Sequence, residues 1–437
     1  MKSDDCLYVG IDFSKYRIDF ALLPADGPPL VYHKAFRKSY SGYQDAKEWL
    51  LKSLAENNLS HIKIAGEATS YYWLPLFMQF VTDHVWEPFH PEPSLVNPTW
   101  IHCFKKTKSF NGKSDCIDPA EIGYYLREYH PATWSFSPHW LSLRFYTRLR
   151  SHLVNSRTRE KNLLNLFIFL LYSSYSSHKP FANYLGSTSK ELLLHPDLMV
   201  RLSSLSLDDL ATELDDLSNH RLPDPLKNAS ALQQVFADAF PQDPAIVSAY
   251  NNIVAILIDT ISYFDSQIAH VEALITSLVS SGEYPQVEWL QTIPGVGFVL
   301  ASGIAAEIGD IALFTQRLIW DKRRLVWRLR TSHEVLSAVA KFAGIWWPEN
   351  SSGKFKAEDA RMSRKGNPYL RYYVLEAADN MRQFIPAFRD YYSSKFDQAN
   401  IHKHKRALVL TGSKCLDLFV TLLRRKEIYR PREVASA

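Results

Sequence analysis

The chain has 437 residues, which is long for one domain and predicts two or three compact units. Hydrophobic residues make up 46% and charged residues 22%, as in ordinary globular proteins, and no run of 18 apolar residues predicts a membrane helix. The four cysteines lack CxxC spacing, and the N-terminus leads directly into a strand-like stretch. We therefore expect a cytoplasmic protein without a disulfide framework, zinc knuckle, signal peptide or membrane span.

The net charge of +4 is unevenly distributed along the chain. Residues 191–246 hold ten acidic side chains against three basic ones, a balance of −7, which leaves +11 on the remainder. The basic residues outside this segment form clusters at residues 105–113, 144–161, 317–330, 361–371, 403–406 and 424–432. Each cluster alone could be a solvated helix face. Together they indicate nucleic-acid binding, because clustered cations displace the counterions of phosphates.

Residues 1–135 predict an α/β domain. Apolar stretches predict strands at residues 7–13, 17–23, 30–36, 61–67 and 84–90, and helical spacing predicts helices at residues 43–56 and 71–81. Three strands before the first helix are typical of a ribonuclease H-like mixed sheet. A dinucleotide-binding fold is disfavoured, because no GxGxxG motif follows the first strand.

Residues 136–285 predict a helical region. Two long amphipathic helices, at residues 141–171 and 244–280, could pack as an antiparallel, coiled-coil-like hairpin or pair between subunits. The acidic segment 176–243 between them predicts a small helical insertion that faces away from nucleic acid. On the first long helix we expect leucines inside and five arginines outside, namely Arg144, Arg148, Arg150, Arg157 and Arg159.

Four carboxylates stand at predicted strand and helix ends. Asp12 lies within the first apolar strand, where an acidic group is costly to bury without compensation. Glu67 closes the strand IKIAGE, which places it at the carboxyl end where α/β sheets bind ligands. Asp115 and Asp118 lie just ahead of a helix that must begin within a few residues of Pro119.

Carboxylates that converge from strands and a helix start form a hard-oxygen site suited to Mg²⁺ or Mn²⁺. Two such ions can stabilise the attacking and leaving oxygens of phosphodiester cleavage. Asp115 and Asp118 could equally be ordinary helix N-caps. Asp12 is harder to explain as a structural residue, because a position inside a strand has no cap to make.

Residues 286–437 predict a mostly helical C-terminal domain. In the run IPGVGFVLASG, Gly295 and Gly297 precede an apolar helix, as in a helix-hairpin-helix turn that brings backbone N–H groups close to a phosphate. The bare pattern could also be a tight turn between helices. A basic stretch interleaved with tryptophans follows, and Arg323 and Arg324 are its candidate nucleic-acid contacts.

A serine-glycine loop and a basic segment follow in SSGKFKAEDARMSRKGNPYLR. Ser351 and Ser352 precede a glycine, and Lys365, Asn367 and Arg371 are further candidate nucleic-acid contacts. A serine hydroxyl is a weak nucleophile unless a base or metal activates it, and no Ser-His-Asp pattern is evident. The residues alone therefore favour a simple Ser-Gly turn.

Both motif sets resemble one protein family. VGIDFSK, GEATSYYW and KSDCIDPAEIGYYL resemble the DEDD transposases of insertion sequences, whose first domain is similar to a Holliday-junction resolvase (RuvC-like). PGVG, AGIWWP, SSG and KGNPYLR follow in the order of the serine transposase domain that ends these proteins. The resemblance covers residues 1–175 and 285–425. Residues 315–335 depart from it by being longer and more basic and aromatic than expected.

The resemblance implies a chemistry and a set of partners. Asp12, Glu67, Asp115 and Asp118 would bind the metal, and Ser352, or failing it Ser351, would form a covalent phosphoserine link to DNA. The metal domain of one subunit would meet the serine domain of another, in a homodimer or a dimer of dimers. The family is also associated with a structured non-coding guide RNA (bridge RNA) from its own element, and its members act on the DNA of the bacterial nucleoid.

Two other functions are compatible with the sequence. The protein could be a metal-dependent Holliday-junction endonuclease, in which water attacks and the serine is only part of a turn. It could also be a catalytically retired copy that only binds nucleic acid.

Overall fold

The computed structural model describes residues 5–68, 70–107, 118–131, 133–134, 137–321, 323–347, 351–352, 355–356, 362–363 and 365–431, with backbone alone at 351–352 and 355–356. The chain divides into two compact units, Met1–Ser137 (unit 1) and Pro138–Ala437 (unit 2). Each unit has two hydrophobic cores of its own.

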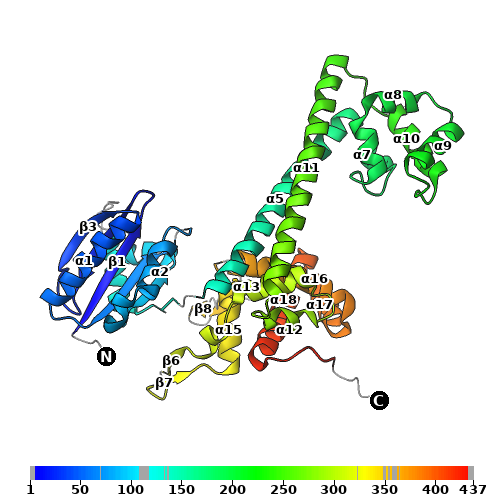
Figure 1. Cartoon of the computed structure of the whole chain (residues 1–437). Coiled ribbons are helices and arrows are strands. Elements are labelled where there is room, and N and C mark those ends of the chain that lie inside the picture. Colours follow the sequence, from blue (N-terminus) through cyan, green and yellow to red (C-terminus); the bar gives the residue numbers. More distant parts are fainter. Residues whose placement is uncertain are drawn as a thin grey trace, which may run out of the picture. The chain divides into compact units, whose positions relative to one another are not determined.

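Unit 1 is built on a five-stranded mixed sheet of order β3-β2-β1-β4-β5 (Figure 1). The strands β1, β2 and β3 are antiparallel, whereas β4 and β5 run parallel to β1. This confirms the predicted mixed α/β sheet with a three-stranded start. The strands are β1 (Cys6–Phe13), β2 (Arg17–Leu23), β3 (Val31–Arg37), β4 (His61–Glu67) and β5 (Glu92–Val96).

Helices cover both faces of this sheet. Alternate residues of β1, such as Val9 and Ile11, pack against α1 (Tyr40–Glu56) and α2 (Leu74–Thr82). The opposite set, including Cys6 and Tyr8, packs against α3 (Pro98–Thr107) and α4 (Asp118–Tyr129). Side chains of even-numbered β1 residues therefore face α4.

The strand predicted at residues 84–90 is wrong. This segment forms a short 3-10 helix, η1 (His84–Phe89), which begins where the Asp83 side chain accepts a hydrogen bond from the Val85 N–H at 3.2 Å. Its apolar residues are explained by Trp86, which is fully buried and donates to the Tyr43 hydroxyl at 3.0 Å. The fifth strand follows the turn, as β5.

Two long helices of unit 2 lie side by side and antiparallel, α5 (Pro138–Leu171) and α11 (Pro244–Val279) (Figure 1). Ion pairs join them at Arg150–Glu272 (2.6 Å) and at Arg157–Asp265. Among the described helices, only α11 is long and apolar enough to cross a membrane, which is weak evidence for a span. Its buried residues recur at three- and four-residue spacing and pack in the two cores of unit 2, as in an amphipathic core helix.

The acidic segment between the long helices is helical, as predicted. Five short helices pack with the ends of α5 and α11 around a separate core (the distal core), which includes Leu164, Leu202, Leu232 and Val254. The helices are α6 (Tyr175–His178), α7 (Ser187–Leu194), α8 (Pro196–Ser203), α9 (Leu207–Leu217) and α10 (Pro225–Ala237).

The other core of unit 2 joins the near ends of α5 and α11 to the C-terminal helices. These are α12 (Pro285–Gln291), α13 (Phe298–Ile308), α14 (Ala312–Thr315), α15 (Ser332–Ala343), α16 (Pro368–Phe384), α17 (Pro386–Asp397) and α18 (Lys403–Arg425). Two short hairpins interrupt them, β6 (Leu318–Asp321) with β7 (Val326–Leu329) and β8 (Ser351–Ser352) with β9 (Phe355–Lys356).

Candidate metal centre and DNA-handling site

The register of β1 and β4 brings two of the predicted carboxylates to one sheet edge. Ile11 pairs with Gly66 in this parallel ladder, so Asp12 and Glu67 hold the next positions on neighbouring strands. Neighbouring strands lie about 4.8 Å apart, and paired residues project to the same face. That face is the one covered by α4, because Ala65 of β4 and Tyr8 of β1 belong to the core on that side.

The helix α4 places the third described carboxylate beside this edge. It begins at Asp118, with Pro119 in its first turn, as the sequence predicts. Its backbone lies directly on β1, because a Cβ built on Gly10 would come within 2.0 Å of the Pro119 carbonyl and 2.4 Å of the Gly123 nitrogen. Only glycine permits this close approach, which brings the start of α4 to the carboxyl end of β1.

Asp12, Glu67 and Asp118 together form the carboxylate edge of unit 1. Burial and nearby negative charges there disfavour the ionised form of Asp12. Burial, followed by the charges of Asp118 and Asp19, raises the pKa of Asp12, and Lys105 partly offsets this effect. The Lys105 ammonium lies 2.7 Å from the Asp118 carboxylate. An amine of the protein thus supplies the positive charge that balances Asp118 in this structure.

The carboxylates fit a divalent cation by their chemistry. Mg²⁺ and Mn²⁺ prefer oxygen ligands, especially carboxylates. A bound cation would also offset the burial and repulsion that make Asp12 costly to ionise. Within the described residues, no group of three or more His, Cys, Asp or Glu side chains is gathered closely enough to hold a metal ion. Asp115 lies outside the described residues, so the predicted set of four stays a prediction.

Sequence reasoning missed two buried acids on the same face. Asp19 of β2 pairs directly with Asp12 and is fully buried, where Arg17 (3.1 Å) and His33 (2.7 Å) contact its carboxylate. Glu121, in the first turn of α4, is also fully buried. A signal for Asp19 was present, because RIDF repeats the acid-within-a-strand pattern of GIDF.

The two glycines of the PGVG turn have different surroundings. Gly295 has a φ of 90°, and a Cβ there would lie 2.9 Å from the Met381 nitrogen of α16, so this glycine is needed to pack the turn against α16. Gly297 is the exposed N-cap of α13, and nothing lies within 4 Å of a Cβ at that position. The exposed start of α13 at Gly297 is therefore where backbone N–H groups of this turn would meet a phosphate.

The predicted nucleophile lies on the β8–β9 hairpin. The backbone of Ser351 pairs with Lys356, and that of Ser352 pairs with Phe355. The side chains of both serines lie outside what the structure describes, so their role stays a prediction.

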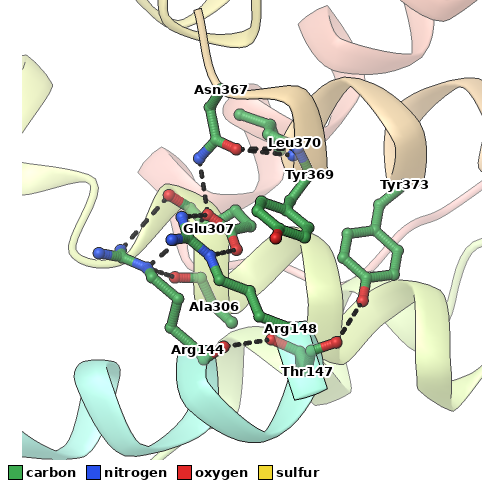
Figure 2. A network of polar contacts seen from close by, with 9 residues as sticks. All are labelled: Arg144, Thr147, Arg148, Ala306, Glu307, Asn367, Tyr369, Leu370 and Tyr373. Carbon is green, nitrogen blue, oxygen red and sulfur yellow. Dashed lines mark hydrogen bonds and ion pairs between the residues drawn. The ribbon is translucent and has the colours of Figure 1, made fainter. Parts of the chain in front are cut away.

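The KGN motif supports the fold through a buried carboxylate, Glu307 of α13 (Figure 2). Asn367 caps α16 by accepting from the N–H groups of Tyr369 (3.0 Å) and Leu370 (3.1 Å). Its amide donates to Glu307 at 2.6 Å. Arg148 of α5 donates two hydrogen bonds to the same carboxylate, at 2.7 and 2.8 Å. The structure therefore gives Asn367 a positioning role in the fold, and nucleic-acid contact by it stays a prediction.

The expectation that the α5 arginines face outward is wrong for most of them. Arg144 and Arg148 pair with Glu307, and Arg150 and Arg157 pair with acids of α11. Among the five arginines, only Arg159 is exposed. The helical spacing did not predict these ion pairs, because the methylene groups of an arginine can pack on an apolar surface while its guanidinium reaches an acid on a neighbouring helix.

The remaining predicted contacts differ in accessibility. Arg371 donates to the Ala343 carbonyl at 3.2 Å, which ties α16 to the end of α15. Lys365 is exposed just before α16. Arg323 and Arg324 are exposed at the tip of the β6–β7 hairpin.

Comparisons with known proteins match two parts of the chain to transposases. Residues 9–168 match a family described as "Transposase", and residues 332–393 match the "Transposase IS116/IS110/IS902 family". The two matches, of 160 and 62 residues, together span half of the 437-residue chain. The first covers the carboxylate edge and α5, and the second runs from α15 into α17.

The chain is also similar to the pilin gene-inverting proteins of Moraxella bovis and Moraxella lacunata. Each is 26% identical over 161 residues, which are 36% of this chain and 47% of the relative. The chain thus spans about half the length of these curated relatives.

Proposed function

We propose that the chain cuts and rejoins DNA as the transposase, or site-specific recombinase, of an insertion sequence, because it matches a transposase family and the IS116/IS110/IS902 transposase family in two separate parts. The observation that carries this proposal is the pair of family matches, one over the carboxylate edge and one over the C-terminal helices. The similarity to proteins named for inverting a pilin gene supports it, because inversion requires strands to be cut and rejoined.

Unit 1 would be the metal-dependent half of the enzyme. Its strand order and its covering helices agree with a ribonuclease H-like, RuvC-like domain. Asp12, Glu67 and Asp118, with Asp115, would hold Mg²⁺ or Mn²⁺. The bound ion would stabilise negative charge on the phosphate during cleavage. Lys105 must then leave Asp118, or share it, when the cation binds.

Unit 2 would supply the nucleophile and the DNA contacts. The Ser352 hydroxyl, with Ser351 as the alternative, would attack a DNA phosphorus, forming a phosphoserine ester and releasing a deoxyribose hydroxyl. The serine proton leaves with a base, and the released oxygen takes up a proton. Attack by the hydroxyl of another strand would reverse the step and rejoin the DNA. The family resemblance further suggests guidance by a non-coding RNA and action as a homodimer or a dimer of dimers.

Substitution of the serines tests this mechanism directly. We predict that Ser352→Ala abolishes strand exchange and the protein–DNA adduct that survives denaturation, a loss of at least about 1000-fold, while DNA binding persists. The measurement is gel analysis of labelled element ends incubated with protein, Mg²⁺ and the element's non-coding RNA. Ser351→Ala should retain the adduct; loss of the adduct in Ser351→Ala, with retention in Ser352→Ala, would assign the nucleophile to Ser351 instead.

The outcomes also separate the other functions. Cleavage by Ser352→Ala at the wild-type rate, without any adduct from the wild-type protein, would indicate a junction endonuclease that uses water. A wild-type protein that binds DNA and cuts none of it would indicate a retired copy.

A further inference from the structure

The β6–β7 hairpin is a small protruding ribbon that neither family match covers. The first match ends at residue 168 and the second begins at residue 332. Within unit 2 the hairpin projects from the helices next to α15 (Figure 1). Residues 316–330 hold six Lys or Arg against one Asp, so the ribbon carries a net charge of +5.

One face of the ribbon is anchored to the fold. Arg328 donates to the Glu334 carboxylate of α15 at 2.8 and 2.8 Å, and to Asp321 on the paired strand at 2.9 Å. The Arg328 hydrogen bonds lower the pKa of Glu334 to about 2, so this bond network is ionised at neutral pH. Asp321 also accepts from the N–H groups of Arg323 (3.0 Å) and Arg324 (3.2 Å), which orders the turn.

The opposite face is apolar and exposed. The pairs Leu318–Leu329 and Trp320–Trp327 lie directly across the two strands, so all four side chains project to the same side. Their exposed fractions are 54%, 54%, 44% and 65% in that order. The two indole rings have centroids 5.6 Å apart and are tilted by 61°. Four large apolar side chains exposed on one face indicate a binding surface.

Cations border this apolar face. Arg317 lies at its base, and Arg323 and Arg324 lie at its tip, all exposed. No carboxylate in the described part of the chain lies within ion-pair distance of these three arginines, whereas Arg328 is already neutralised by Asp321 and Glu334. The positive charge of the hairpin that no carboxylate neutralises therefore lies around the tryptophans, which favours an anionic partner.

We propose that the exposed face of this hairpin (Leu318, Trp320, Trp327 and Leu329, with Arg317, Arg323 and Arg324) binds single-stranded DNA, with unpaired bases stacked on the tryptophans and phosphates held by the arginines. A duplex hides its base faces, whereas a separated strand offers both a stacking surface and phosphates to such a site. The proposal rests on the proposed function, because strand exchange produces separated DNA strands. It assigns the hairpin the task of holding one of them.

Fluorescence anisotropy of the full chain with a labelled 20-nucleotide single strand tests the proposal. Trp327→Ala should weaken binding about 5- to 100-fold, and Trp327→Phe should weaken it far less, because a phenyl ring still stacks. The double variant R323A/R324A should lower the slope of log affinity against log salt by about 1.4, at about 0.7 for each lost phosphate contact. Affinity for a matched duplex should change less than affinity for the single strand.

Controls come from the segment between α5 and α11, where Phe240 is 73% exposed and Arg221 is exposed. F240A and R221A should bind the single strand as wild type does. Wild-type affinity in Trp327→Ala and in R323A/R324A would overturn the hairpin proposal while leaving the transposase proposal intact. Weakened binding of an RNA strand alone, or loss of self-association in light scattering with unchanged DNA affinity, would also overturn it, in favour of RNA or of a second copy of the chain. Failure of the wild-type protein to bind any DNA would instead contradict the proposed function itself.

Discussion

Asp12 lies half-buried in β1, beside other acids, at a position where its ionised form is disfavoured. Burial and the charges of Asp118 and Asp19 raise its pKa above the ordinary value of 3.8. A carboxyl group whose pKa is raised by folding binds protons more tightly in the folded state, so its contribution to stability is present below the folded pKa and is lost as pH rises through it. Such a cost is expected where function requires negative charges to be held together.

Asp12→Asn should therefore stabilise the metal-free protein. At pH 7 we expect an increase of about 0.5–2 kcal/mol in the free energy of unfolding, because the amide removes the buried repulsion. The stability difference between the variant and the wild type should grow as pH rises from about 4, because the Asp12 carboxyl ionises over this range and the amide does not. Denaturant unfolding in a chelator from pH 4 to 8 measures both effects. Equal stability of the two proteins at all these pH values would show that Asp12 is already compensated.

Residue-scale chemistry was the part of the site most accessible from sequence. An acid inside an apolar strand has few structural explanations, so Asp12 stood out, and Pro119 fixed the start of α4. Asn367 was harder, because a polar residue before a helix fits an N-cap and a phosphate contact equally well. Its bond to Glu307 joins residues 60 positions apart, and no local pattern reveals such a contact.

Between helices, a buried polar network joins α5 to α13 and α16. Glu307 has no solvent-exposed surface, and Arg148, Arg144 and Asn367 surround its carboxylate (Figure 2). Tyr373 of α16 adds a hydrogen bond to the Thr147 carbonyl of α5 at 3.0 Å. These bonds fix the base of the α5–α11 hairpin on the C-terminal helices.

Arg148→Ala should destabilise unit 2 strongly. Without Arg148, the buried Glu307 carboxylate keeps the Arg144 ion pair at 3.8 Å and the hydrogen bond from the Asn367 amide. Removing one partner of a buried ion pair typically costs about 3–5 kcal/mol. Arg159→Ala, an exposed arginine on the same helix, should change stability by less than about 0.5 kcal/mol. Chemical unfolding followed by circular dichroism compares the two. Similar midpoints would mean that the Glu307 network contributes little to the fold.

Hydrophobic periodicity predicted both long helices to within a few residues, because their spacing is regular over many turns. The same method failed at η1, where a short apolar run was taken for a strand. A local cap from Asp83 and the burial of Trp86 against Tyr43 decide that segment, and the second of these depends on a tertiary neighbour. The β6–β7 hairpin was not predicted, since alternation over four residues is too short to identify a strand.

At the scale of the whole molecule, the residues of the two proposed chemistries lie in different compact units. The acids of the proposed metal centre all belong to unit 1, whereas the proposed serine and the arginine-bordered hairpin belong to unit 2. The acidic segment has a core of its own at the far ends of α5 and α11, distinct from the core that joins the other ends of these helices to the C-terminal helices. The predicted third boundary at residue 285 remains a prediction.

The proposed cleavage chemistry requires the carboxylate edge to bind a divalent cation. Titration calorimetry of Mn²⁺ into the full-length protein, compared with Asp12→Asn, Asp118→Asn and the exposed control Asp45→Asn, measures this directly. We predict that the wild type and Asp45→Asn bind Mn²⁺ equally and that each site variant loses at least about 10-fold in affinity, because a charged oxygen ligand is removed. Unchanged Mn²⁺ affinity in both Asp12→Asn and Asp118→Asn would contradict the proposed metal centre.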